Sequence, residues 1–173
     1  DKYEYFFIID DDILIETKNI NKMFEIAKKY NLWICGPSFL PTESNMISHA
    51  ITVNIPELLL TYTNFVEVNT PLFNKYALKN LMEYYDDCLI GWGIDYLYIW
   101  ANGIDEKNKF AIIHDITCIN PKPEYKILKN RNYERELSLI DKWEKRNKIW
   151  EKYSEKIKCP SKFTLSVYGY LKK

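Results

Sequence analysis

The sequence has little of what zinc sites, membrane spans and nucleic-acid-binding surfaces usually require. Its 173 residues include two histidines, His49 and His114, and four cysteines without a CxxC pair, so a structural zinc site is not predicted. The cysteines are widely spaced, which favours free buried thiols in a reducing compartment. Lys plus Arg and Asp plus Glu both number 24, and a chain without net charge has no general attraction to nucleic acid.

No apolar stretch reaches membrane-spanning length and no signal peptide is recognisable, so we expect a cytoplasmic protein. The C-terminal stretch KFTLSVYGYLKK mixes lysines with aromatic and aliphatic residues. Packed C-terminal segments commonly have this composition, and it leaves peripheral membrane association open. The chain begins at Asp1, directly before an apolar run, and we expect it to be a piece of a longer protein that starts in mid-domain.

The most informative local feature is the stretch FFIIDDDILI, residues 6–15, in which three carboxylates interrupt an apolar run. An apolar run of this length predicts a strand, at about residues 3–9, that is buried on both faces of a parallel sheet. Asp10 and Asp12 are two residues apart, so in an extended segment their side chains point the same way. Paired carboxylates at a strand end suit Mg²⁺ or Mn²⁺, although a solvated turn is the simpler alternative.

Strand and helix patterns alternate along the chain, which predicts an α/β fold. Helices are expected at residues 17–30, where apolar residues recur at helical spacing, at 74–87 with Asn74 as N-cap, at 94–103, and along a charged stretch at 132–153. Strands are expected at 32–36, ended by Gly36 and Pro37, at one or two places within 58–73, and at 109–120. Aromatic residues make up 16% of the chain, which fits a thick core or a groove that stacks on sugar or base rings.

A second informative stretch is CLIGWGIDYLYIW, residues 88–100. Gly91 and Gly93 flank Trp92 and allow a tight turn with close approach to a ligand. The turn opens into a helix and places Asp95 in its first turn. The helix dipole alone favours an acidic residue there, and Trp92 could belong to the core, so each motif by itself also has a purely structural interpretation.

Taken together, the two motifs resemble the second half of a GT-A-type glycosyltransferase domain. The segments FVEVNTPLF, LIGWGIDYLYIW and FAIIHDITCINPKP are similar to an uncharacterised family of plant and bacterial glycosyltransferase-like proteins with a VE-x-x-x-P-x-F strand and an H-G-W-G-x-D helix start. The resemblance covers roughly residues 3–125. The chain has Ile90, His114 and Asn120 where that family often has His, Asp and a late metal-binding His.

The resemblance implies a nucleotide-diphospho-sugar transferase sheet with flanking helices, incomplete at its N-terminus. Residues 1–125 would form the C-terminal part of the catalytic domain, and residues 126–173 a helix and tail packed on it. The implied reaction moves a sugar from a nucleotide-sugar to a hydroxyl group on a glycan or lipid-linked acceptor, with Mn²⁺ or Mg²⁺ as cofactor.

The resemblance also implies a role for each site residue. Asp95 would be the acceptor-side catalytic carboxylate, expected to share a cleft with Asp12. The remaining assignments are Asp10, Asp11 and Asp12 to cofactor binding, Asp10, Asp12 and Asn120 to the metal, and Glu67, Gly91, Trp92 and Gly93 to substrate.

Three other classes compete with this interpretation. A phosphatase of the D-x-D-x-T type would need a threonine that the acidic stretch lacks. A two-metal nuclease would need basic residues near the carboxylates, whereas here they concentrate after Lys122. A non-catalytic carbohydrate-binding or scaffolding domain with the same fold remains the main alternative, and it would bind sugar without metal.

Overall fold

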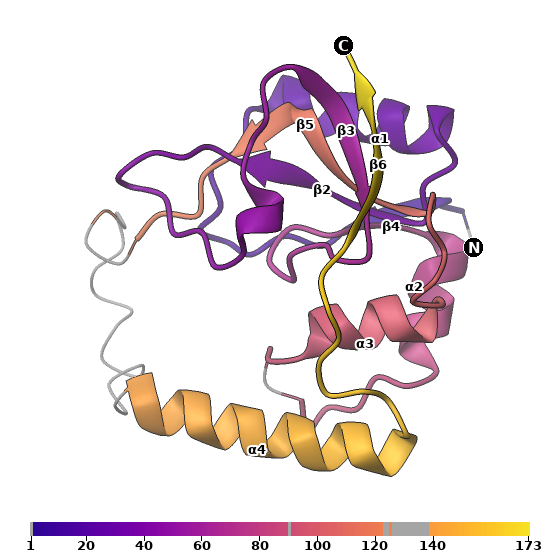
Figure 1. The fold of residues 1–173 in the computed structure, drawn as a ribbon, viewed down its shortest axis with the longest axis vertical. Coiled ribbons are helices and arrows are strands. Elements are labelled where there is room, and N and C mark those ends of the chain that lie inside the picture. The colour runs from indigo at the N-terminus through magenta and orange to yellow at the C-terminus, as the bar shows by residue number, and fades with distance from the viewer. Residues whose placement is uncertain (1, 90, 123–124, 126–138) are drawn as a thin grey trace.

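The computed structural model describes residues 2–89, 91–122, 125 and 139–173. Within these residues, six strands form one mixed sheet in the order β1-β4-β2-β5-β3-β6 (Figure 1). The strands are β1 (Tyr5–Phe7), β2 (Ile34–Phe39), β3 (Leu58–Thr63), β4 (Leu72–Asn74), β5 (Phe110–Cys118) and β6 (Val167–Lys172). β2 and β5 are parallel, and the other neighbouring strands are antiparallel. The α/β class expected from the sequence is therefore confirmed.

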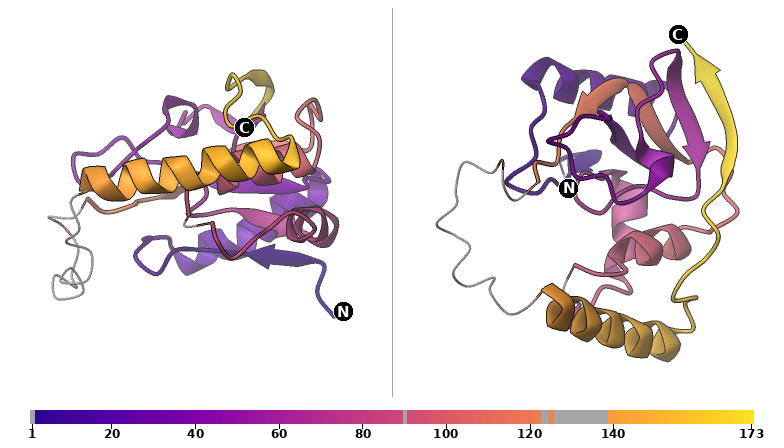
Figure 2. Two further views of the ribbon diagram at one scale, coloured as in Figure 1. Left: turned by 90° about the horizontal axis from the view of Figure 1, so that it is seen from below. Right: turned by 60° about the vertical axis from the view of Figure 1, so that its left-hand side comes forward.

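Helices cover both faces of this sheet. They are α1 (Thr17–Lys29), α2 (Lys75–Met82), α3 (Ile94–Ala101) and α4 (Leu139–Ile157), with a short 3₁₀ helix, η1 (Ala50–Thr52). α1 lies on one face, α2 and α3 lie on the other, and α4 forms an outer layer beyond α3 (Figures 1 and 2). None of the helices in the described part of the chain is both long and apolar enough to cross a membrane.

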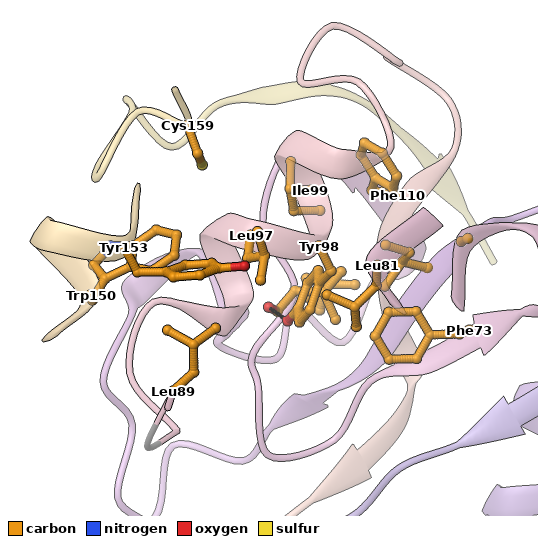
Figure 3. Close-up of a cluster of buried hydrophobic side chains, with 14 residues drawn as sticks. Phe73, Leu81, Leu89, Leu97, Tyr98, Ile99, Phe110, Trp150, Tyr153 and Cys159 are labelled. Atoms are coloured by element: carbon orange, nitrogen blue, oxygen red, sulfur yellow. Dashed lines mark hydrogen bonds between the residues drawn. The ribbon is translucent and has the colours of Figure 1, made fainter. Parts of the chain in front are cut away.

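Two buried clusters hold these layers together. The first, on the α1 side, contains Met23 and Ala27 of α1 packed against strand residues such as Cys35 and Ile113. The second lies between the sheet, α3 and α4 and is the aromatic one. Figure 3 shows Trp150 and Tyr153 of α4 beside Leu97 of α3, with Tyr98, Phe73 and Phe110 deeper in the layer. Much of the chain's aromatic content therefore serves the core.

Local signals predicted two features of the helices correctly, but not every boundary. α2 ends at Met82 and not at residue 87, and residues 132–138 of the expected charged helix lie outside the described residues. The apolar stripe at residues 20, 23, 24 and 27 forms the inner face of α1, where Met23 and Ala27 are fully buried. Asn74 caps α2 as expected, because its Oδ1 accepts a hydrogen bond from the Ala77 N–H at 2.7 Å. Both predictions depend only on residues within one or two helical turns of each other.

Two strand predictions were wrong. β1 is the edge strand of the described sheet and its residues are only partly buried, while Ile8 and Ile9 are 47% and 38% exposed. An edge strand has one hydrogen-bonded neighbour, here β4, so it cannot be enclosed like a central strand. β2 does not end at Gly36 and Pro37 but continues to Phe39, with a shift in its pairing to β5 after Pro37. The shift directly follows a proline, which has no N–H to donate to a neighbouring strand.

The C-terminal stretch is part of the sheet. β6 pairs with β3 in antiparallel register, from Leu58 opposite Lys172 to Thr63 opposite Val167. The side chain of Asn64 secures the approach to this strand, since its Nδ2 donates to the Thr164 carbonyl at 2.9 Å and its Oδ1 accepts from the Ser166 N–H at 2.7 Å. The mixed composition of the tail thus reflects an edge strand, with Val167 and Tyr170 exposed and Leu171 packed against the core.

Candidate functional site

The carboxyl ends of β1, β2 and β5 meet at one edge of the sheet. β4 is antiparallel to both β1 and β2, and β5 is parallel to β2, so the three strands point the same way. The acidic turn follows β1, a long loop containing His49 follows β2, and Asn120 follows β5. Ligands of open α/β sheets bind at this edge.

The acidic turn, residues 10–12, is held between two other segments. The Asp10 N–H donates to the Asn69 carbonyl at 3.0 Å, which ties the turn to the loop of residues 64–71. Leu14 and Ile119 form an isolated antiparallel bridge through two hydrogen bonds of 2.9 and 3.0 Å. Asn120 directly follows Ile119, so the backbone of the third predicted metal ligand lies beside the segment that carries Asp12.

The chemistry of these three residues fits a cation that is shared with substrate. Carboxylate and amide oxygens suit Mg²⁺ and Mn²⁺, and Mg²⁺ is commonly bound through one or two carboxylates and substrate phosphates. Among the described residues, no group of three or more His, Cys, Asp or Glu side chains could hold a metal ion by itself. We therefore expect little metal binding to the protein without a phosphate-bearing ligand.

The loop of residues 64–71 carries Glu67 across the sheet towards the same edge. Gly36 of β2 makes room for it, because a Cβ at this position would lie 3.0 Å from Val66 Cγ1 and 3.4 Å from the Thr70 carbonyl oxygen. The hydroxyl of Tyr98 on α3 donates to the carbonyl of Val66 and fixes the loop from the other side. Glu67 itself is 8% exposed.

Glu67 is paired with His49, a residue that the sequence did not single out. Its Oε2 lies 2.9 Å from His49 Nδ1, and the imidazole packs on Phe65 with ring centroids 4.4 Å apart. The hydrogen bond to Glu67 raises the pKa of His49 above its usual value and outweighs partial burial, which acts in the opposite direction. The two residues are 18 positions apart in the sequence, and no short motif signals a contact across such a loop.

Asp95 lies in the first turn of α3, as expected. It is buried, although an acidic residue at a helix N-terminus can remain exposed to solvent. The residue is 7% exposed, and its Oδ1 accepts from the Tyr96 N–H at 2.9 Å. Burial, followed by the charge of Glu67, raises the pKa of Asp95 to about 7. A carboxyl group with this pKa exchanges a proton near neutral pH, which is what a general base or acid needs.

The turn before α3 is shaped by contacts with α4. Gly91 and Gly93 both have left-handed backbones, with φ of 70° and 77°. A Cβ on Gly93 would lie 2.2 Å from Trp150 Cδ2, whereas one on Gly91 would meet nothing within 4 Å. The close approach that Gly93 permits is therefore to the protein's own tryptophan, and the open side of the turn is at Gly91.

Trp92 also contacts α4. Its indole N–H donates to Asn147 Oδ1 at 3.1 Å, and its ring packs edge-on against Trp143 with centroids 4.5 Å apart. Trp92 is only partly buried, so part of its side chain remains exposed. Ile90, the residue before this turn, lies outside the described residues.

His114 and Asp115 of β5 have structural partners. His114 is buried, accepts from the Ile55 N–H at Nδ1 and bonds Thr61 Oγ1 through Nε2, at 3.1 and 2.8 Å. Burial lowers its pKa to about 4, so it is neutral at physiological pH. Asp115 pairs with Lys22 and Lys173 at 2.5 and 3.1 Å. Burial acts to raise the pKa of its carboxyl group, but the two lysines together outweigh it and lower the pKa.

Because the pKa of Asp95 is raised in the folded state, we expect its contribution to stability to fall as pH rises. A carboxyl group with a lowered pKa would have the opposite effect. Between its usual pKa of 3.8 and the folded value of about 7, the folded protein binds more protons at this group than the unfolded chain. The free energy of unfolding therefore falls as pH rises through this range. Asp95→Asn should remove this loss and raise the free energy of unfolding at pH 8 by up to about 4 kcal/mol, at roughly 1.4 kcal/mol per pKa unit.

Urea unfolding of both forms at pH 4 and pH 8 measures this effect. The two proteins should be nearly equal at pH 4, where the Asp95 carboxyl is largely protonated in the folded state. A constant difference at both pH values would show that the carboxyl group does not titrate abnormally.

Comparisons with known proteins assign no family to this chain: no family model, curated protein or solved structure matches it.

Proposed function

We propose that the protein is a GT-A-like glycosyltransferase that moves a sugar from a nucleotide-sugar to a hydroxyl acceptor. The observation that carries the proposal is Asp95, a buried carboxyl group with a pKa of about 7 that responds to the charges of Glu67 and His49. The loop that carries Glu67 also bonds the acidic turn, through the Asn69 carbonyl. If the acidic stretch were only a solvated turn and Asp95 only a helix-terminal residue, the burial and raised pKa of Asp95 would not be expected. The sequence resemblance to GT-A domains supports the same assignment.

In this mechanism Asp95 is the general base. The acceptor hydroxyl oxygen attacks the anomeric carbon, its proton passes to the Asp95 carboxylate, and the bond from that carbon to the diphosphate breaks with inversion. Burial and the neighbouring Glu67 charge raise the proton affinity of Asp95, which makes it a stronger base than an exposed carboxylate. Gly91 and the exposed part of Trp92 would border the acceptor.

The acidic turn would bind the donor. Asp10 and Asp12, with Asn120 beside them, would hold Mg²⁺ or Mn²⁺ together with the donor diphosphate, and Asp11 would contribute to the same site. The bound ion would neutralise the negative charge of the diphosphate. The acceptor would be a glycan or a lipid-linked sugar, and we propose no nucleic-acid partner. In a lipid-linked case, the exposed side chains of β6, Val167 and Tyr170, are available for contact with a membrane surface.

The test is release of nucleoside diphosphate from a panel of nucleotide-sugars by the full-length protein, with and without Mn²⁺. We expect release to require the metal, and Asp12→Asn to weaken Mn²⁺ binding in the presence of nucleoside diphosphate by at least about tenfold, since even outer-shell changes at metal sites cost this much. Isothermal titration calorimetry should show little Mn²⁺ binding without the nucleotide.

Asp105→Asn is the charge-matched control. Asp105 is exposed in the turn before β5, at the opposite end of that strand, and its substitution should leave both measurements unchanged. Sugar binding without release of nucleoside diphosphate from any donor would instead support the non-catalytic carbohydrate-binding function. Equal Mn²⁺ affinity in wild type and Asp12→Asn would remove the acidic turn from the metal site.

A further inference from the structure

The imidazole of His49 has one nitrogen committed to the protein and one that is not. Nδ1 is bonded to Glu67, and the ring is fixed against Phe65. Every buried side-chain nitrogen and oxygen of the described residues has a hydrogen-bond partner, yet Nε2 of His49 bonds to none of these residues. Nε2 must therefore be accessible to solvent, in agreement with a side chain that is 28% exposed.

His49 is linked to both halves of the proposed site. Its loop is anchored at the end of β5, where the Met46 N–H donates to the Asn120 carbonyl at 2.7 Å and Asn45 Oδ1 accepts from the Asn120 N–H at 2.8 Å. Its partner Glu67 belongs to the loop that also bonds the acidic turn through Asn69. Its charge also acts on Asp95, so one imidazole is connected to the metal side and to the base.

Charge indicates what Nε2 would bind. Glu67 and Asp95 are two carboxyl groups that interact electrostatically with each other and with His49. An anionic ligand next to them requires a positive partner. Of the two side-chain charges that shift the pKa of Asp95, Glu67 raises it and His49 lowers it. An imidazolium N–H that faces solvent is a strong donor to a phosphate oxygen.

We propose that protonated His49, held in place by Glu67, donates a hydrogen bond from Nε2 to a phosphate oxygen of the donor diphosphate. This role rests on the proposed function and specifies how the leaving diphosphate is held between the acidic turn and Asp95. His49 keeps its proton in this arrangement, so it acts by binding and charge and makes or breaks no bond.

The test follows the His49 imidazole by NMR while inorganic pyrophosphate and Mg²⁺ bind to the full-length protein. The His49 signal is identified as the one that disappears in His49→Gln. By reciprocity, a ligand that prefers the protonated form tenfold raises the pKa of His49 by one unit, and we expect a shift of this size or more. His114 is the internal control, because its pKa of about 4 should not move.

The same variant gives a second readout. Gln keeps a neutral N–H donor but carries no charge, so His49→Gln should weaken pyrophosphate binding about 10- to 100-fold, the range for hydrogen bonds to charged groups. If pyrophosphate binds and the pKa of His49 stays unchanged, the role of His49 is overturned while the glycosyltransferase proposal stands. If the protein neither binds pyrophosphate nor releases nucleoside diphosphate from a donor, both proposals fail.

Discussion

Asp95→Asn should lower kcat about 10²- to 10⁴-fold, the usual contribution of a general base, while donor binding stays intact. Asn fills the same volume and can accept from the Tyr96 N–H as Asp95 does, so the turn should keep its shape. The loss should appear in kcat rather than KM, because proton transfer belongs to the transition state. The variant is expected to be at least as stable as wild type at the assay pH, so unfolding would not explain a loss of kcat.

The pH profile makes this prediction specific. The wild-type rate should rise with pH through about 7, where Asp95 loses its proton, and this limb should be absent in Asp95→Asn. Glu67→Gln should move the limb to lower pH, because Glu67 raises the pKa of Asp95 more than His49 lowers it. A limb that stays in place in both variants would mean that another group is the base, and full activity of Asp95→Asn would exclude Asp95 directly.

Gly93→Ala should be the most destabilising of the single-methyl changes in the turn before α3. The left-handed backbone costs an alanine about 1–2 kcal/mol, and the new Cβ would overlap Trp150, whose ring atoms lie 2.2–2.4 Å from its position. Overpacking of this kind adds about 1–3 kcal/mol. The combined loss of about 2–5 kcal/mol should lower Tm by several degrees or more in a chain of this size, measurable by thermal or urea unfolding.

Gly91→Ala is the matched control for this effect. Its φ of 70° is close to the 77° of Gly93, so the backbone cost is the same, but a Cβ there meets nothing within 4 Å. The difference between the two variants isolates the contact with Trp150. Equal losses would mean that α4 yields to the added methyl group and does not constrain the turn.

Features that depend on residues close together in the sequence were predicted correctly, and features that depend on distant residues were not. The cap at Asn74 and the inner face of α1 depend on residues within a few positions, and both were predicted. The exposure of β1 and the continuation of β2 past Pro37 depend on which strands lie beside them, and both were predicted wrongly. Neighbouring strands in this sheet are distant in sequence, so no local pattern reveals them.

The same distinction applies to the site. Asp10, Asp12 and Asp95 stood out because each has an unusual local context, and the structure places the acidic turn against the loop that carries Glu67. His49 was missed because its importance comes from a contact with Glu67 across a loop. Trp92 was assigned to substrate, and the structure adds its contacts with Asn147 and Trp143. No local pattern could reveal these contacts, because both partners belong to a helix far along the chain.

The pairing of β6 with β3 has a consequence for synthesis. Asn64 and Ser166, which join at the entrance to this strand pair, are 102 residues apart, and β2 pairs in parallel with β5 across a similarly long stretch. Contacts of this separation slow folding, because a long loop must close before they form. While the chain is being made, β3 remains without its outer neighbour until residues 167–172 have left the ribosome. Until then the outer edge of β3 presents unpaired backbone groups, the kind of strand edge through which chains aggregate.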